Sequence, residues 1–422
     1  MGASRTLPTS GREKITQILE QAAAELPGCG LAICDVDGVV YEEYRGKRDI
    51  LDDASPGVDQ NTLMWFASTT KLLTSVAVLQ MVQRGELGLD TPVSEFLPQL
   101  STPLRIFERL DDEGKPVYRH TSTEITLSMM LNQSAGFGGE FREKVVAWKS
   151  SLPDGSPGKG FVNSCKKENL VNTPIVEEPG QVYQYGNACE WLGLLVEAVT
   201  GQPFETYMQE NVFRPLGMDH STFYPFDDRP AHLDESVMPL RWYEDEKGEF
   251  QELTTQSPGL TLPRRKADIE YPVGGGGIYS TCSDYVKLLH HLLAIKSGEG
   301  KVEPTPILSS DLVSTLFAPT LLPNARKSMT ALFGDLYQAK EDGELDWSTG
   351  MCLYLKDEPR GGWGRHKGSA GWMGAAGTEF WIDPDAKIAC VWSTNLMPYT
   401  TPNIDKYKVK LEKAIYEALE TE

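Results

Sequence analysis

The stretch from residue 64 to residue 85 constrains the fold of this chain more than any other. Apolar residues fall on several faces of its second half, which predicts a helix buried on most of its sides. Arg84 and Gly85 are typical of the C-terminal end of such a helix, a cation followed by a residue that tolerates a left-handed backbone. Ser68 and Lys71 lie three residues apart at the N-terminal end, and therefore on one face.

This pair of side chains suggests nucleophilic chemistry. A serine hydroxyl is a weak nucleophile until a base accepts its proton. Burial disfavours the charged form of a lysine and lowers its pKa, so we expect Lys71 to supply a neutral amine as that base. The N–H groups at the helix N-terminus would stabilise a developing oxyanion. An ordinary capping serine is the alternative, because Ser-x-x-Lys also occurs at 156–159 and 164–167, in a loop-like stretch rich in proline, glycine and lysine.

Length and charge limit the classes of protein to be considered. With 422 residues, 40% of them hydrophobic, the chain can bury a sizeable core, and we expect one catalytic unit of two lobes over 1–422. The formal net charge of −20 argues against nucleic acid or an anionic membrane as a partner. No run is long enough to span a bilayer, and the first residues do not resemble a secretory signal, so a cytoplasmic location is predicted.

The seven cysteines are scattered along the chain. They form no Cys-x-x-Cys pair and no His/Cys group with zinc spacing. Most are expected to be small buried hydrophobic residues. The sequence therefore predicts no metal site, and we expect no organic cofactor.

The strand signals lie at the two ends of the chain. An amphipathic helix over 12–26 precedes two β-prone runs at 30–34 and 39–44, and strand-like segments return after residue 347. This order predicts an α/β (α+β) fold, with one antiparallel sheet built from both termini, flanked by helices, and with a mostly helical lobe inserted. The expected sheet lobe comprises 12–62 and 270–420, the helical lobe comprises 63–269, and the later strands and last helix are placed at 350–355, 378–382, 388–394 and 406–419.

The middle of the chain is expected to combine short helices with loops. Residues 93–118 should form a short helical piece followed by a loop rich in Asp and Glu. Residues 150–180 should form a long surface excursion, and 226–268 an insertion that covers or borders another part of the protein. Four glycines at 274–277 lack the lysine and serine or threonine of a phosphate loop, so we expect close backbone packing before a helix at 284–295. Further helices are predicted at 125–131, 188–200 and 204–213.

A second chemical interpretation attaches to Asp35-Val36-Asp37-Gly38. An apolar strand followed by Asp-x-Asp-Gly-Val resembles the nucleophile motif of haloacid-dehalogenase-type phosphatases. That family also needs a later Gly-Asp-x-x-x-Asp, and Ala339 stands where the second aspartate would follow Gly334 and Asp335. Asp-Gly between two β-prone runs is a strong hairpin signal, which favours a hairpin over the phosphatase.

Two further segments complete the candidate chemistry. Tyr185-Gly186-Asn187 lies between a turn and a helix, where a phenol beside an ammonium can relay a proton; the alternative is a packed tyrosine bonded to a carbonyl. Residues 365–377 place small residues ahead of an aromatic strand, which suits an edge that approaches a substrate closely. An edge N–H there, with that of Ser68, would complete an oxyanion hole. His366 is as consistent with a surface position as with catalysis.

Together these motifs, in this order, resemble the class C β-lactamase and penicillin-binding-protein superfamily. The likeness runs from about residue 27 to 415, with supporting segments at 215–218, 274–281 and 380–384. Within that superfamily the chain is similar to the fungal transesterases of the lovastatin acyltransferase type and to related carboxylesterases.

The resemblance implies roles for named residues. Ser68 would be acylated, Lys71 and Tyr185 would be base and proton relay, and the N–H groups of Ser68 and Ala375 would form the oxyanion hole. The family's Lys-Thr-Gly is replaced by Trp372-Met373-Gly374, which favours a neutral ester over a β-lactam or peptide; Lys367-Gly368-Ser369 is the rival register. The expected substrate-binding residues are Asn187, Trp65, Trp372, Gly374, Tyr271 and Tyr399.

The function implied is that of a serine esterase or acyltransferase working through an acyl-enzyme. Its partners would be a small ester or thioester donor, which includes an acyl-carrier-bound chain, and water or an alcohol as acceptor, in fungal polyketide metabolism. A β-lactamase or D-amino-acid peptidase of the same fold is the alternative, and a non-catalytic binding protein is a more distant one. Oligomeric state is left open.

Overall fold

The computed structural model describes residues 7–227, 236–253, 262–300, 302, 305–356, 362 and 364–420. Met1 to Thr6 and parts of the expected insertion at 226–268 lie outside these residues. Within them, no helix is both long and apolar enough to cross a membrane.

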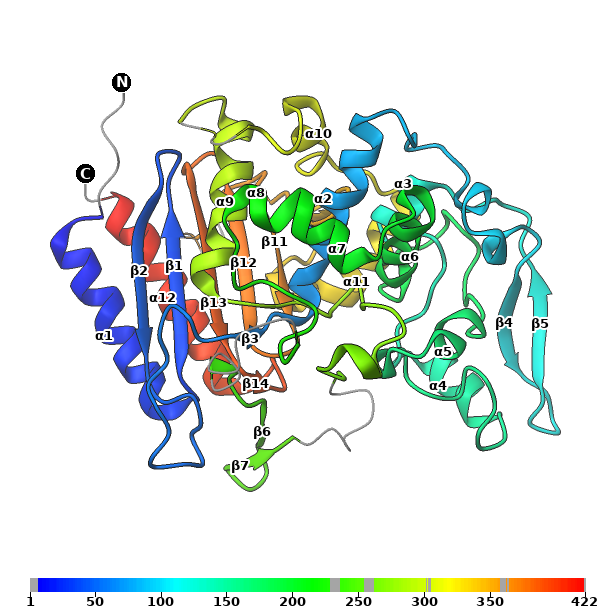
Figure 1. Cartoon of the computed structure of the whole chain (residues 1–422), viewed down its shortest axis with the longest axis horizontal. Coiled ribbons are helices and arrows are strands. Elements are labelled where there is room, and N and C mark those ends of the chain that lie inside the picture. The colour runs from blue at the N-terminus through cyan, green and yellow to red at the C-terminus, as the bar shows by residue number, and fades with distance from the viewer. Residues whose placement is uncertain are drawn as a thin grey trace.

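A seven-stranded sheet takes its strands from both ends of the chain, as predicted. The hairpin β1–β2 joins the C-terminal strands because β1 pairs antiparallel with β13. The strand order is β2-β1-β13-β12-β11-β10-β9 (Figure 1). The strands are β1 (Cys29–Cys34), β2 (Val39–Arg45), β9 (Leu345–Trp347), β10 (Cys352–Tyr354), β11 (Ala370–Gly374), β12 (Thr378–Asp383) and β13 (Ile388–Thr394).

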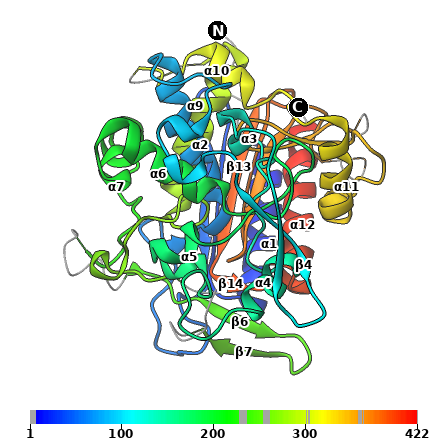
Figure 2. The same ribbon diagram turned by 90° about the vertical axis from the view of Figure 1, so that its right-hand side faces the viewer.

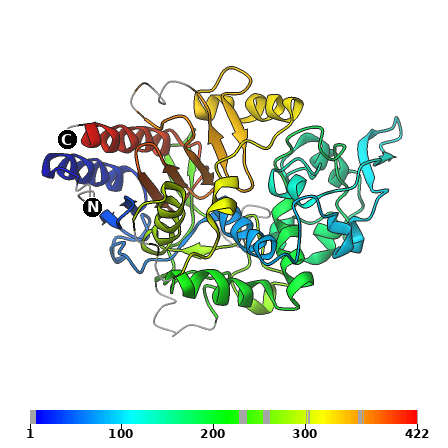
Figure 3. The ribbon, with the colours of Figure 1, turned by 90° about the horizontal axis from the view of Figure 1, so that it is seen from above.

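Helices cover both faces of this sheet, which is why β1, β12 and β13 are continuously buried rather than alternating. Leu31 and Ile33 face one apolar core with α1 (Thr9–Glu25) and α12 (Pro402–Glu420), which lie side by side (Figure 3). Ala32 and Cys34 face the larger core with α9 (Cys282–Ser297) on the other side (Figure 2). Successive side chains of one strand thus divide between two cores, as strand geometry requires.

The hairpin prediction for Asp35 is confirmed. Its Oδ1 accepts hydrogen bonds from the N–H groups of Asp37 and Gly38 at 2.8 and 3.0 Å, which closes a tight turn between β1 and β2. The strand therefore returns along the sheet instead of leading into a helix, unlike the arrangement expected for the phosphatase.

The chain between the two halves of the sheet is mostly helical. Its central helix is α2 (Thr70–Gln83), preceded by one 3₁₀ turn, Ala67–Thr69, that contains Ser68. The other α-helices of the described residues are α3 (Leu127–Leu131), α4 (Glu143–Ser150), α5 (Lys167–Val171), α6 (Ala188–Thr200), α7 (Phe204–Met208), α8 (Arg214–Leu216), α10 (Ser310–Thr315) and α11 (Pro323–Tyr337). Of these, α6 packs on α2, α11 on β9, and α4 on the strand at 105–110. Short strands form small sheets: β3 (Met64–Trp65) with β8 (Tyr279–Ser280), and β14 (Leu396–Met397) with β6 (Arg241–Glu244) and β7 (Glu249–Glu252).

Two expectations for the middle of the chain are wrong. The predicted acidic loop is a hairpin, β4 (Arg105–Leu110) with β5 (Pro116–His120), whose pairing buries Ile106 and Phe107. The predicted surface excursion at 150–180 is anchored in the core by buried side chains, because Val162, Leu170 and Ile175 pack there. Mixed polar composition concealed both elements, since only a few apolar residues hold each in place.

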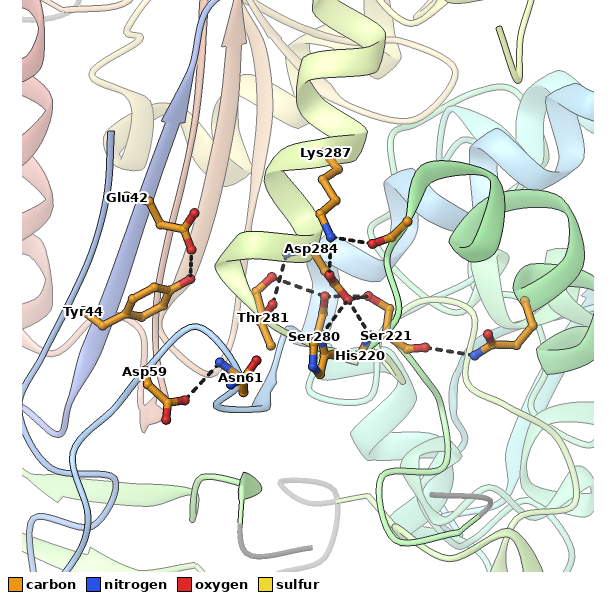
Figure 4. A network of polar contacts seen from close by, with 12 residues as sticks. Glu42, Tyr44, Asp59, Asn61, His220, Ser221, Ser280, Thr281, Asp284 and Lys287 are labelled. Atoms are coloured by element: carbon orange, nitrogen blue, oxygen red, sulfur yellow. Dashed lines mark hydrogen bonds and ion pairs between the residues drawn. The ribbon is translucent and has the colours of Figure 1, made fainter. Parts of the chain in front are cut away.

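A polar network fixes the start of α9 against β8 and against the segment that contains His220 and Ser221 (Figure 4). Asp284, in the first turn of α9, accepts hydrogen bonds from the His220 N–H at 2.7 Å and from the Ser221 hydroxyl at 3.2 Å. Ser221 in turn bonds to Ser280 of β8 at 2.8 Å. Because β8 pairs with β3, this network holds the strand that ends just before Ser68.

Candidate active site

Ser68 lies on a strained turn at the start of α2. The preceding residue, Ala67, has a φ of 46°, a left-handed conformation that is uncommon for a residue with a Cβ. One backbone N–H and two hydroxyls hold this turn. The Phe66 carbonyl accepts from the Thr69 N–H and from the Thr378 hydroxyl, and the Ala67 carbonyl accepts from the Thr70 hydroxyl. Strain held in this way is typical of functional sites.

Lys71 is buried beside Ser68 on the first turn of α2, with a relative exposure of 4%. Its Nζ donates a hydrogen bond to the Gly275 carbonyl at 2.6 Å, and it lies 4.6 Å from the centre of the Tyr185 ring. The glycine run at 274–277 is wedged between α2 and α6, since a Cβ on Gly274 would come within 2.3 Å of the Cys189 carbonyl oxygen. The prediction of close backbone packing is confirmed.

The expected lowering of the pKa of Lys71 is wrong. Burial opposes the ammonium form, but the interactions of Lys71 with Tyr185, Cys189 and Glu190 outweigh burial and raise the pKa of Lys71 above its usual range. Sequence reasoning considered burial alone, because the opposing groups lie more than a hundred positions further along the chain.

Tyr185 is held by an aromatic cluster. The Trp372 indole N–H donates to its hydroxyl oxygen at 3.0 Å, and the Phe333 ring lies edge-on at 5.6 Å. Its loop packs backbone to backbone on the loop before α4, where a Cβ on Gly186 would come within 2.1 Å of the Phe137 carbonyl oxygen. The phenol is thus fixed from two sides, and its hydroxyl accepts from a side chain of the sheet.

A cavity of about 350 Å³ brings most of the predicted residues together. Ser68, Lys71, Tyr185 and Ala375 line it, with Trp65, Asn187, Trp372 and Tyr399. Asn187 precedes α6 without capping it through its side chain, and it lines the cavity. The lining residues that the sequence did not indicate are Gly139, Glu140, Phe141, Arg142, Asn163, Glu190, Phe333 and Met397.

Two predicted substrate contacts lie elsewhere. Tyr271 does not line the cavity: it is 1% exposed, and its hydroxyl donates to the Val162 carbonyl at 3.2 Å. Gly374 acts beneath the cavity, because its lack of a Cβ lets β11 approach the Phe66 carbonyl and Ala67. Both residues are close to site residues in the sequence, but in the structure they are packed in the core.

The two alternative third motifs, Trp372-Met373-Gly374 and Lys367-Gly368-Ser369, lie at different places relative to the cavity. Trp372, Met373 and Ala375 line the cavity, whereas Lys367 is exposed ahead of β11. His366 pairs with Asp383 at 2.9 Å, away from the cavity. Neither of the other Ser-x-x-Lys segments contributes its serine to the cavity.

The described residues contain no group of His, Cys, Asp and Glu side chains able to hold a metal ion. All seven cysteines are buried thiols, as expected. Burial raises the pKa of Cys189, the thiol nearest the candidate site, to about 12, and Lys71 opposes that rise.

The antiparallel sheet and the serine, lysine and tyrosine gathered at one cavity define a serine hydrolase or acyltransferase of the β-lactamase type. The chain belongs to this family: the Beta-lactamase family model matches residues 15–414.

Relatives with known activities are acyltransferases and esterases. The chain is 27% identical over 405 residues to monacolin J acid methylbutanoyltransferase of Aspergillus terreus, covering 93% of this chain and 92% of the relative. It is 27% identical over 374 residues to lovastatin esterase of Penicillium rubens, covering 84% and 85%. The solved structure of the LovD6 mutant of simvastatin synthase from Aspergillus terreus matches with a TM-score of 0.82 at 25% identity, over 98% and 96% of the two chains.

Proposed function

We propose that this protein transfers an acyl group from a small ester or thioester, through an acyl-enzyme on Ser68, to water or an alcohol. The observation that carries the proposal is the convergence of Ser68, Lys71, Tyr185 and Ala375 on one cavity. In this scheme the Lys71–Tyr185 pair accepts the Ser68 proton as Oγ attacks the carbonyl carbon. The N–H groups of Ser68 and Ala375 stabilise the oxyanion. The tetrahedral intermediate then collapses and expels the alcohol or thiol, which takes that proton, and leaves the acyl group on Ser68. Water or an alcohol next gives its proton to the Lys71–Tyr185 pair, attacks the acyl carbonyl and releases Ser68, which recovers the proton.

The lining supports a neutral, largely apolar acyl chain as substrate. Trp65, Phe141, Phe333, Met397 and Tyr399 supply apolar surface to the cavity. Strand β11 itself supplies no cation for a β-lactam or peptide carboxylate, since its residues are uncharged and Lys367 lies exposed before it. Relatives named for statin substrates support a polyketide-like acyl donor or acceptor and a place in fungal secondary metabolism. The proposed enzyme consists of two lobes: a sheet lobe formed by 12–62 and 270–420, and a mostly helical lobe formed by 63–269.

Intact-mass measurement tests this proposal directly. Incubation with a fluorophosphonate or a p-nitrophenyl ester should add one adduct to the wild type, and none to Ser68→Ala. Ser156→Ala and Ser164→Ala, from the other two Ser-x-x-Lys segments, are matched controls that should be labelled like the wild type. No adduct on the wild type, or an adduct that survives Ser68→Ala, would refute it. Adding an alcohol acceptor to the ester assay separates transfer from hydrolysis.

A further inference from the structure

Glu190 is a buried acid in the cavity to which the proposed mechanism gives no role. It lies in the first turn of α6, directly after the Tyr185–Asn187 segment, and is 6% exposed. It lines the same cavity as Ser68 and Lys71. Its Oε2 is enclosed and has no hydrogen-bond partner among the described residues. Buried carboxyl groups without a partner are rare, because burial of the charged form is costly unless an opposite charge compensates it.

Gly275 links this carboxyl group to Lys71. A Cβ on Gly275 would lie 2.3 Å from Glu190 Oε1 and 3.0 Å from Oε2, so the carboxyl group rests against this residue. The carbonyl of the same residue accepts the hydrogen bond from Lys71 Nζ at 2.6 Å. One glycine therefore separates the acid from the amine, close enough for their charges to interact in a buried site.

The neighbouring charges make Lys71 the counterion of Glu190. Burial raises the pKa of Glu190, and Lys71 opposes that rise. Glu140, the nearby acid, is already neutralised by Lys149 at 2.7 Å. Lys71 faces Tyr185, Cys189 and Glu190, and Glu190 faces Lys71, Glu140, Tyr271, Cys165 and Cys189.

We propose that Glu190 is a positioning residue whose carboxylate compensates the charge of Lys71 and so sets the pH at which Lys71 and Tyr185 accept the Ser68 proton. This inference rests on the proposed function. Without the carboxylate, the ammonium of Lys71 would lose its counterion in a buried site and release its proton at lower pH. The Lys71–Tyr185 pair could then accept the Ser68 proton at lower pH, although it would be a weaker base.

The pH dependence of acylation tests this inference. The burst of p-nitrophenol released from an activated ester is measured from about pH 5 to about pH 10, so that the titration of the proposed Lys71–Tyr185 base falls within the measured range. For Glu190→Gln, which keeps the size of the side chain, the acid limb should move to lower pH by about one unit, with KM changed less than about twofold. Glu197→Gln removes a charge from the same helix outside the cavity and retains the acceptor for the Phe204 N–H, so its profile should match the wild type.

A second variant distinguishes charge from folding. Glu190→Met also removes the charge but leaves an apolar side chain, which a buried site tolerates well. Both variants should show the same downward shift. An unchanged acid limb, an upward shift, or a shift in only one folded variant would overturn the inference. A wild type that is never acylated would instead refute the proposed function, so the two failures are distinct.

Discussion

The indole N–H of Trp372 donates a hydrogen bond to the hydroxyl oxygen of Tyr185 at 3.0 Å. This bond occupies one lone pair of the phenol and leaves its own proton free to point elsewhere. Trp372 comes from β11 and Tyr185 from the loop before α6, so the bond ties the sheet to the helical part at the candidate site. The orientation of the proposed proton relay therefore depends on a residue of the sheet.

Replacing Trp372 by phenylalanine should reduce turnover more than binding. The variant keeps an aromatic ring near Tyr185 but loses the donor, so we expect kcat to fall by roughly tenfold, the value of about one hydrogen bond. Steady-state kinetics with a p-nitrophenyl ester measures the change. Trp381→Phe is the control, because that tryptophan lies on β12 and does not line the cavity. A rise in KM with kcat unchanged would contradict this role.

Replacing Lys71 by methionine should abolish acylation while preserving the fold. Methionine matches the length of the side chain but removes the proton acceptor, so we expect kcat/KM to fall by about 10³-fold or more. Lys159→Met, from another Ser-x-x-Lys segment, is the matched control and should keep wild-type activity. A Lys71→Met variant with more than about a tenth of wild-type activity would be incompatible with the proposed chemistry.

An alanine at position 374 should separate β11 from the Ser68 turn. Its Cβ would lie 2.1 Å from Thr378 Oγ1 and 2.4 Å from the Phe66 carbonyl oxygen, and both would have to move. We expect the free energy of unfolding to drop by roughly 1–3 kcal/mol and kcat/KM to fall by about 10²-fold. Gly57→Ala, whose Cβ would meet nothing closer than 3.7 Å, is the control. Thermal denaturation and ester kinetics measure both effects, and unchanged kinetics would show that this close approach does not position the site.

Acid should remove stability that Glu178 provides. Partial burial raises the pKa of its carboxyl, but Arg119 and the N–H groups of Ser122 and Thr123 outweigh burial and lower the pKa from 4.5 to about 2. The stabilisation is therefore present above about pH 4.5 and is lost as the pH falls towards 2. At neutral pH we expect Glu178→Gln to unfold with a free energy lower by roughly 1–2 kcal/mol.

Urea denaturation at several pH values measures this difference. It should shrink as the pH falls towards 2 and approach zero only below pH 2, where the wild-type carboxyl becomes protonated as well. Glu108→Gln removes a more exposed partner of Arg119, at 3.4 Å, and should have little effect at any pH. A difference that is independent of pH would show that the carboxylate charge of Glu178 is not responsible.

Periodicity identified most of the fold because the sheet and its main helices are strongly apolar. The strand predicted at 388–394 and the helix predicted at 188–200 coincide with β13 and α6. The β4–β5 hairpin escaped because its strands are largely polar, with Ile106 and Phe107 as its buried anchors.

The candidate site was predictable where a motif has local spacing, as with Ser68 and Lys71. It was not predictable where contacts join distant segments. Phe333 reaches Tyr185 from α11, and Glu190 reaches Lys71 through Gly275, and neither contact leaves a local signature. Tyr271 shows the converse, since a position close to the glycine run still turned into the core.

The sheet built from both termini also affects how the protein is made. The Thr378 hydroxyl that holds the Ser68 turn lies 312 residues beyond the Phe66 carbonyl it binds, and Thr394 reaches back 367 residues to Pro27. The ribosome therefore releases the serine segment long before the strands that complete its surroundings. An unfinished polypeptide presents an open sheet edge, and its candidate site is completed only when translation is nearly over.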